Sequence, residues 1–206
     1  MSNAKNKIDE KDILEFFKYS YFGNLKDPIE AASNRAYRDM CRTIRFGNFQ
    51  GDRVELKKEV NSFLYKQIKK IVNDSITSQE KFDSWHCKVC KNIKLLYNEK
   101  GINFTYGQAQ KWLNMTIKYL YMLEDEEYSF DCVFEYLHIP IDNYIFVAVK
   151  KELRIDRPNN PWSKLDVIEY LEYQKAIGEE LKKRKYSPLL WEFDKWLEVA
   201  KGNNKK

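Results

Sequence analysis

The sequence predicts an all-α protein with a single compact domain of about eight helices. Apolar residues recur at spacings of three and four along most of its 206 residues, which is the period of a helix that buries one side. With 43% hydrophobic and 15% aromatic residues, the chain can also bury a substantial core. We expect the domain to span residues 8–200, between a disordered or tag-like N-terminus (1–7) and a disordered polar tail (201–206).

Four helices are expected in the first half of the chain. A short helix at 9–19 precedes Pro28, which opens a second helix at the first-turn position that proline favours. This second helix is predicted to run to about Phe46, where the sequence GNFQGD breaks it. Apolar stripes then predict a third helix at 53–73 and a fourth at 78–98.

In the second half, the sequence GINFTYG interrupts the pattern before a fifth helix, expected at about 106–123, and a short segment follows at 129–137. The run at 141–153 is ambiguous, because YIFVAV suits a buried strand whereas the spacing of its apolar residues fits a helix. We favour a helix, since no other run alternates and a lone strand would have no partner with which to pair.

The last two helices follow the proline-rich connection RIDRPNNPWS. Ser163 is the predicted N-cap of a helix from 164 to 183, and Pro188 starts the final helix. Trp191 is expected on the polar face of this helix, opposite an apolar face made of Leu189, Phe193, Trp196, Leu197 and Ala200.

Charge and hydropathy exclude several classes of protein. The net charge of +5, from 36 basic and 31 acidic residues, is far below that of a protein that coats nucleic acid, so any such role depends on how charge is arranged. No run of 18 apolar residues occurs, and the N-terminus has no hydrophobic signal core. We therefore expect a cytoplasmic protein with no membrane partner.

Four arginines in the second predicted helix, Arg35, Arg38, Arg42 and Arg45, fall within roughly an 80° sector at 100° per residue. Like charges so close together repel, so an anionic partner is expected. One interpretation is internal pairing on a neighbouring helix, and the other is an external anion such as a phosphate, which guanidinium groups bind bidentately. The candidate internal partners are Glu124, Asp125, Glu126, Glu127, Asp131, Asp166 and Glu169.

The fifth predicted helix adds two basic candidates. Lys111 and Lys118 lie on its polar side together with Asn114, where they face either solvent or a phosphate. We include both lysines with the four arginines as candidate anion-binding residues.

The metal-binding and catalytic motifs in the sequence are less specific than the arginine pattern. HCKVC contains a C-x-x-C pair, Cys87 and Cys90, and Cys132 and His138 lie about forty residues further on. True zinc knuckles sit in turns rather than within a helix, so neither a metal nor another cofactor is expected. His138 and Asp142 are interpreted as a helix cap or a core contact, and no nucleophile accompanies them. A binding role is therefore favoured over an enzymatic one.

The segment YGQAQKWLNMTIKYL (106–120), together with HIPID (138–142), resembles a family of small uncharacterised bacterial helical proteins. This resemblance implies a helical fold and brings no activity with it. Function is predicted from the arginines instead, as binding of an anionic partner such as nucleic acid or phosphate. The alternative is a helical protein-interaction or structural module whose arginines are paired internally.

Overall fold

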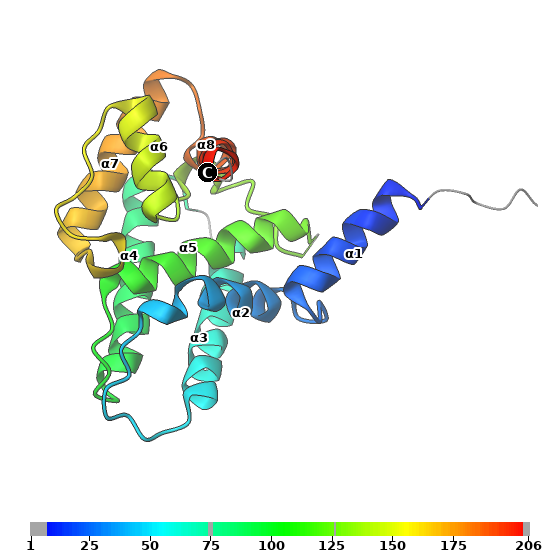
Figure 1. The fold of residues 1–206 in the computed structure, drawn as a ribbon, viewed down its shortest axis with the longest axis vertical. Coiled ribbons are helices and arrows are strands. Elements are labelled where there is room, and N and C mark those ends of the chain that lie inside the picture. The colour runs from blue at the N-terminus through cyan, green and yellow to red at the C-terminus, as the bar shows by residue number, and fades with distance from the viewer. Residues whose placement is uncertain (1–7, 74–75, 126, 204–206) are drawn as a thin grey trace, which may run out of the picture.

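The chain forms eight α-helices and no strand over the residues that the computed structural model describes, which are 8–73, 76–125 and 127–203 (Figure 1). This confirms the all-α, single-domain prediction. The helices are α1 (Glu10–Phe22), α2 (Pro28–Met40), α3 (Arg53–Asn73), α4 (Gln79–Asn98), α5 (Tyr106–Leu123), α6 (Asn143–Leu153), α7 (Val167–Lys183) and α8 (Pro188–Asn203). Short 3-10 turns lie at Cys41–Thr43 (η1), Phe134–Tyr136 (η2) and Trp162–Lys164 (η3).

The second helix is shorter than predicted. Pro28 does stand in its first turn, behind the Asp27 cap, but α2 ends at Met40, and η1 then leads to extended backbone at Ile44. The Thr43 hydroxyl donates to the Met40 carbonyl and so satisfies one of the acceptors that the helix end leaves open. As a result, Arg42 and Arg45 lie beyond α2, and the four arginines do not share one helix.

The predicted N-cap of the seventh helix is also wrong. Asp166 caps α7 in a reciprocal capping box with Glu169, whereas Ser163 lies in η3. η3 is held against the start of α5, because the Thr105 hydroxyl donates to the Ser163 carbonyl over 2.6 Å. Any side chain at Gly107 would collide with the Trp162 carbonyl, so this close approach requires glycine.

α5 is the central helix, and it crosses the middle of the molecule with α2 alongside it (Figure 1). It also contacts α4, α7 and η3, so every residue from 106 to 120 is buried. The expectation that Lys111, Asn114 and Lys118 form a solvated face is therefore wrong. These side chains point into the interior, where each polar group requires a partner.

The ambiguous run at 141–153 is helical, as predicted, and Asp142 caps α6 by accepting a hydrogen bond from the Ile145 N–H. The predicted face of the last helix is only partly correct. Leu189 is buried and Trp196 packs against the core, but Phe193 and Leu197 are exposed, and Trp191, expected on the polar face, is buried. α8 continues to Asn203, beyond the predicted start of the polar tail at 201. The predictions for residues 1–7 and 204–206 lie outside the described residues.

Candidate functional site

Three of the four arginines predicted to bind an anion lie at the surface where α2 ends. The side chains of Arg38, Arg42 and Arg45 are exposed, and none has a carboxylate within ion-pair distance among the described residues. Arg38 stands in the last turn of α2, where the negative end of the helix dipole stabilises one cation. Because no described carboxylate pairs with these three arginines, the N–H donors of their guanidinium groups are available to an external acceptor.

Arg35 is separate from the other three. Its guanidinium lies 3.1 Å from the Asp39 carboxylate and 4.0 Å from the centre of the Tyr21 ring, which joins α2 to α1. Burial opposes the charged form, but the hydrogen bond to Tyr21 and the charge of Asp39 raise the pKa of Arg35. Arg35 therefore stabilises the fold and takes no part in the exposed group.

The carboxylates predicted as internal partners lie elsewhere. Glu124 pairs with Lys18 and Glu127 with Lys69, while Asp166 and Glu169 form the α7 cap. Glu126 lies outside the described residues. Internal pairing therefore applies to Arg35, through a different carboxylate, Asp39, from those predicted.

Two further cations lie over aromatic rings, Tyr37 and Phe46, that are next to Arg38 and Arg45 in the sequence. The Arg53 guanidinium of α3 lies 4.2 Å from the centre of the Phe46 ring, and the Lys57 ammonium lies 6.0 Å from that of Tyr37. The rings of Phe46 and Phe49 are 6.3 Å apart and only partly buried. We call Arg38, Arg42, Arg45 and Arg53, with these rings, the arginine surface.

Lys111 and Lys118 do not lie on the arginine surface. The Lys111 ammonium is 2.7 Å from Asp142, and the Lys118 ammonium is 2.6 Å from Glu192 of α8, with all four side chains largely buried. Burial opposes ionisation of Asp142, but Lys111 outweighs it and lowers the pKa of that carboxyl. For Glu192 burial dominates and raises the pKa, although Lys118 lies beside it.

His138 binds Asp83 of α4 rather than Asp142, which caps α6. The His138 Nε2–H donates to the Asp83 carboxylate over 2.8 Å, and its Nδ1 accepts from the Tyr170 hydroxyl over 3.0 Å. Partial burial opposes ionisation of Asp83, but the hydrogen bonds from His138 and Gln79 lower its pKa. No spacing rule points to this pair, because 55 residues separate its members.

The Tyr170 hydroxyl continues this interior network. It accepts a hydrogen bond from the Asn114 amide over 2.8 Å, and the Asn114 carbonyl accepts one from His86 Nε2–H over 2.8 Å. Burial lowers the pKa of His86 well below its ordinary range, and the neighbouring His138 adds to the effect. The network thus holds α4, α5 and α7 together with a neutral His86 at its inner end.

The cysteines are dispersed over the structure. Cys90 is buried, with its sulfur 3.8 Å from the His86 ring, whereas Cys87 is partly exposed and Cys132 is exposed on the loop before η2. Within the described ranges, no group of three or more histidine, cysteine or carboxylate side chains is arranged to hold a metal ion.

Comparison of the chain with family models, with curated proteins and with solved structures finds no match. The resemblance to a bacterial helical family therefore stays a prediction, as does a cytoplasmic location. Among the described helices, none has both the length and the apolar character to cross a membrane.

Proposed function

We propose that this protein binds an anionic partner through the arginine surface, with nucleic acid as the favoured ligand. The observation that carries the proposal is that Arg38, Arg42 and Arg45 are exposed and that no carboxylate in the described part of the chain lies within ion-pair distance of them. The other basic candidates, Arg35, Lys111 and Lys118, have carboxylate partners inside the protein.

Phosphate suits this group of side chains. Guanidinium groups present a planar fork of N–H donors that matches two phosphate oxygens, and three such forks can contact successive phosphates of a strand. Phe46 and Phe49 offer rings on which an unpaired base can stack, so the surface favours a single strand. Binding is expected to be weak and independent of base sequence, because phosphate contacts carry no sequence information.

The test is a titration of labelled single-stranded and duplex oligonucleotides over a salt series. If Arg38, Arg42 and Arg45 each contact one phosphate, the slope of log affinity against log salt should be about −2 to −3. Arg38→Gln/Arg42→Gln should weaken binding and flatten this slope by about 1 to 2.

The matched control is Lys150→Gln/Lys151→Gln on α6, which removes two positive charges from exposed side chains elsewhere. It should leave the salt slope nearly unchanged. Absence of binding by the wild type at about 50 mM salt, where electrostatic attraction is strong, would overturn the proposal. Equal losses in both double variants would show a response to net charge alone and would also contradict it.

A further inference from the structure

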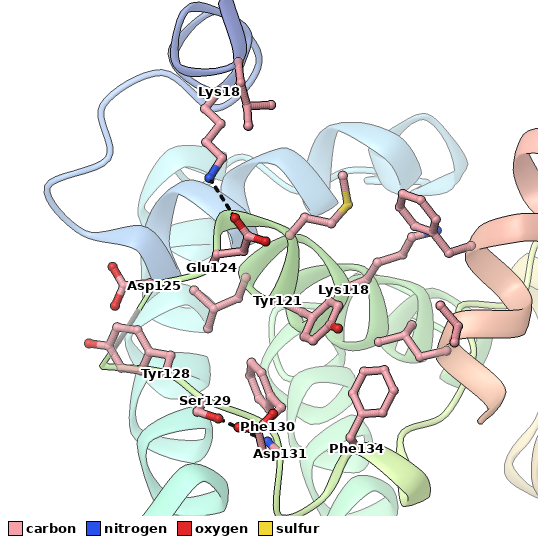
Figure 2. Close-up of a pocket in the computed structure, with 16 residues that line it drawn as sticks. Lys18, Lys118, Tyr121, Glu124, Asp125, Tyr128, Ser129, Phe130, Asp131 and Phe134 are labelled. Carbon is pink, nitrogen blue, oxygen red and sulfur yellow. Dashed lines mark hydrogen bonds and ion pairs between the residues drawn. The ribbon is translucent and has the colours of Figure 1, made fainter. Parts of the chain in front are cut away.

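A groove of about 530 Å³ lies between α1, the end of α5 and the start of α8 (Figure 2). Its walls also include residues 124–125 and 128–131 after α5, with Phe130 among them, and Phe134 at the start of η2. Much of the lining is apolar and open to solvent, since Tyr121 is 45% exposed and Leu190 is 50% exposed. Exposed apolar side chains gathered in one concave place mark a binding surface more often than single ones do.

α1 projects beyond the body of the protein (Figure 1). None of its residues is buried, and Phe16 and Phe17 are 68% and 61% exposed. Its C-terminal end is anchored, because the Lys18 ammonium donates to the Leu123 carbonyl over 3.1 Å and Tyr21 packs on Tyr119. The helix is therefore a fixed wall of the groove whose outer part has nothing to pack against within the described chain.

The charge around the groove is negative, although the whole chain is positive. Asp125 and Asp131, which line the groove, have no cation within ion-pair distance among the described residues. Beyond the lining, α1 and its cap carry four carboxylates, Asp9, Glu10, Asp12 and Glu15, and one further cation, Lys11. The two lysines that line the groove are already neutralised, Lys18 by Glu124 at 3.7 Å and Lys118 by Glu192 at 2.6 Å. A complementary ligand is therefore apolar on one side and basic at its edges.

This charge argues against two other occupants. A second copy that used its own α1 would bring four carboxylates, Asp9, Glu10, Asp12 and Glu15, and only two lysines, Lys11 and Lys18, against Asp125 and Asp131, so the net interaction is repulsive. An anionic membrane surface would be repelled for the same reason, because interfacial helices that bind such membranes carry lysine and arginine on the polar face.

We propose that the groove and the apolar side of α1 form a docking site for a basic amphipathic helix of another protein. In such complexes, apolar side chains at positions i, i+3 or i+4, and i+7 enter the groove. Here they contact Leu14, Tyr121 and Leu190, while flanking lysines or arginines meet Asp125 and Asp131. This site is independent of the arginine surface and of its ligand.

The test uses a labelled amphipathic helical peptide of about 18 residues built from leucine and lysine, the length of five helical turns. Fluorescence anisotropy should show at least about tenfold tighter binding of this peptide than of a leucine and glutamate peptide with the same pattern. Met122 and Leu190 are exposed apolar residues of the lining, so binding should weaken about tenfold in Met122→Gln/Leu190→Gln. Asp125→Asn/Asp131→Asn should reduce the salt dependence of binding.

Ile168→Gln on α7 is the matched control, since this exposed isoleucine lies away from the groove residues and should leave peptide affinity unchanged. Arg38→Gln/Arg42→Gln should also leave it unchanged, which separates this proposal from nucleic-acid binding. Equal binding of both peptides, or no effect of the groove variants, would overturn the proposal. So would a dimer in sedimentation equilibrium that Leu190→Gln dissociates, or groove-dependent binding to vesicles of phosphatidylcholine and phosphatidylglycerol.

Discussion

The two lysines of α5 and the exposed arginines at the end of α2 have similar sequence patterns and opposite surroundings. Both groups recur at helical spacing beside an apolar stripe. Lys111 and Lys118 lie on a helix that is covered on every side, and each has a carboxylate within 2.7 Å. Arg38 and Arg42 lie at the surface where α2 ends, and neither has a carboxylate within ion-pair distance among the described residues.

This difference follows from the free energy of dehydration. A buried ammonium loses its water and destabilises the fold by several kcal/mol unless a carboxylate replaces the lost interactions, so the partners of buried lysines are structural. An exposed guanidinium keeps its water and needs no internal partner. Basic residues that persist at a surface without a carboxylate are therefore candidates for binding, whereas buried pairs hold the fold together.

Among these residues, substitution of Lys118 is predicted to cause the largest loss of stability. Lys118→Met would leave Glu192 buried without its cation, and one oxygen of that carboxylate already has no hydrogen-bond partner. The free energy of unfolding, measured in urea, should fall by about 3 to 5 kcal/mol.

The double variant Lys118→Met/Glu192→Leu is the control for this prediction. Because it removes both charges, it should recover most of the lost stability. If Lys118→Met lowers the free energy of unfolding by less than about 1 kcal/mol, the Lys118–Glu192 pair is solvated. The proposed difference between buried lysines and exposed arginines would then be contradicted.

A smaller loss is expected at Lys111. Lys111→Met leaves Asp142 partly solvated and still bound to the Ile145 N–H as the cap of α6, so unfolding should become easier by about 2 kcal/mol. Lys150→Met on α6, whose ion pair with Asp156 is largely exposed, should change stability very little. Similar urea midpoints for the two variants would contradict the role given to burial.

Acid should weaken the interior network. Burial depresses the pKa of His86 in the folded protein, whereas in the unfolded chain the pKa of this histidine is about 6.5. Below about pH 6.5 the unfolded chain therefore binds one more proton than the folded protein does. The contribution is therefore complete above that pH and is lost as pH falls, by up to about 1.4 kcal/mol per pH unit. His86→Gln should remove most of this slope between pH 6.5 and 5, and an unchanged slope would exclude His86 as its source.

Much of the fold was predictable because helical periodicity is a local signal. The apolar stripes at 53–73 and 78–98 matched α3 and α4 within one residue, and the 141–153 run was correctly read as a helix. The errors occur where tertiary contacts decide. The end of α2 at Met40 depends on a 3-10 turn, and the burial of Trp191 depends on which side of α8 meets the body.

The candidate sites were only partly predictable. Periodicity located the basic stripes but could not distinguish a helix surrounded on all sides from one with a free face, so the polar residues of α5 were expected at the surface. The His138 partner could not be inferred either, since Asp83 lies on a distant helix. The groove is formed by three separate segments, α1, the end of α5 with its loop, and the start of α8, so no single stretch of sequence encodes it.

The predicted change in stability is small for the arginine surface. Measuring it is the most direct test of whether Arg38 and Arg42 contribute to folding. Equilibrium urea unfolding should be compared for the wild type, Arg38→Gln/Arg42→Gln and Lys118→Met. The arginine variant should unfold within about 0.5 kcal/mol of the wild type, as expected for exposed residues without partners. A loss of several kcal/mol, comparable with that of Lys118→Met, would mean that the arginines are paired internally and would contradict their assignment to an external anion.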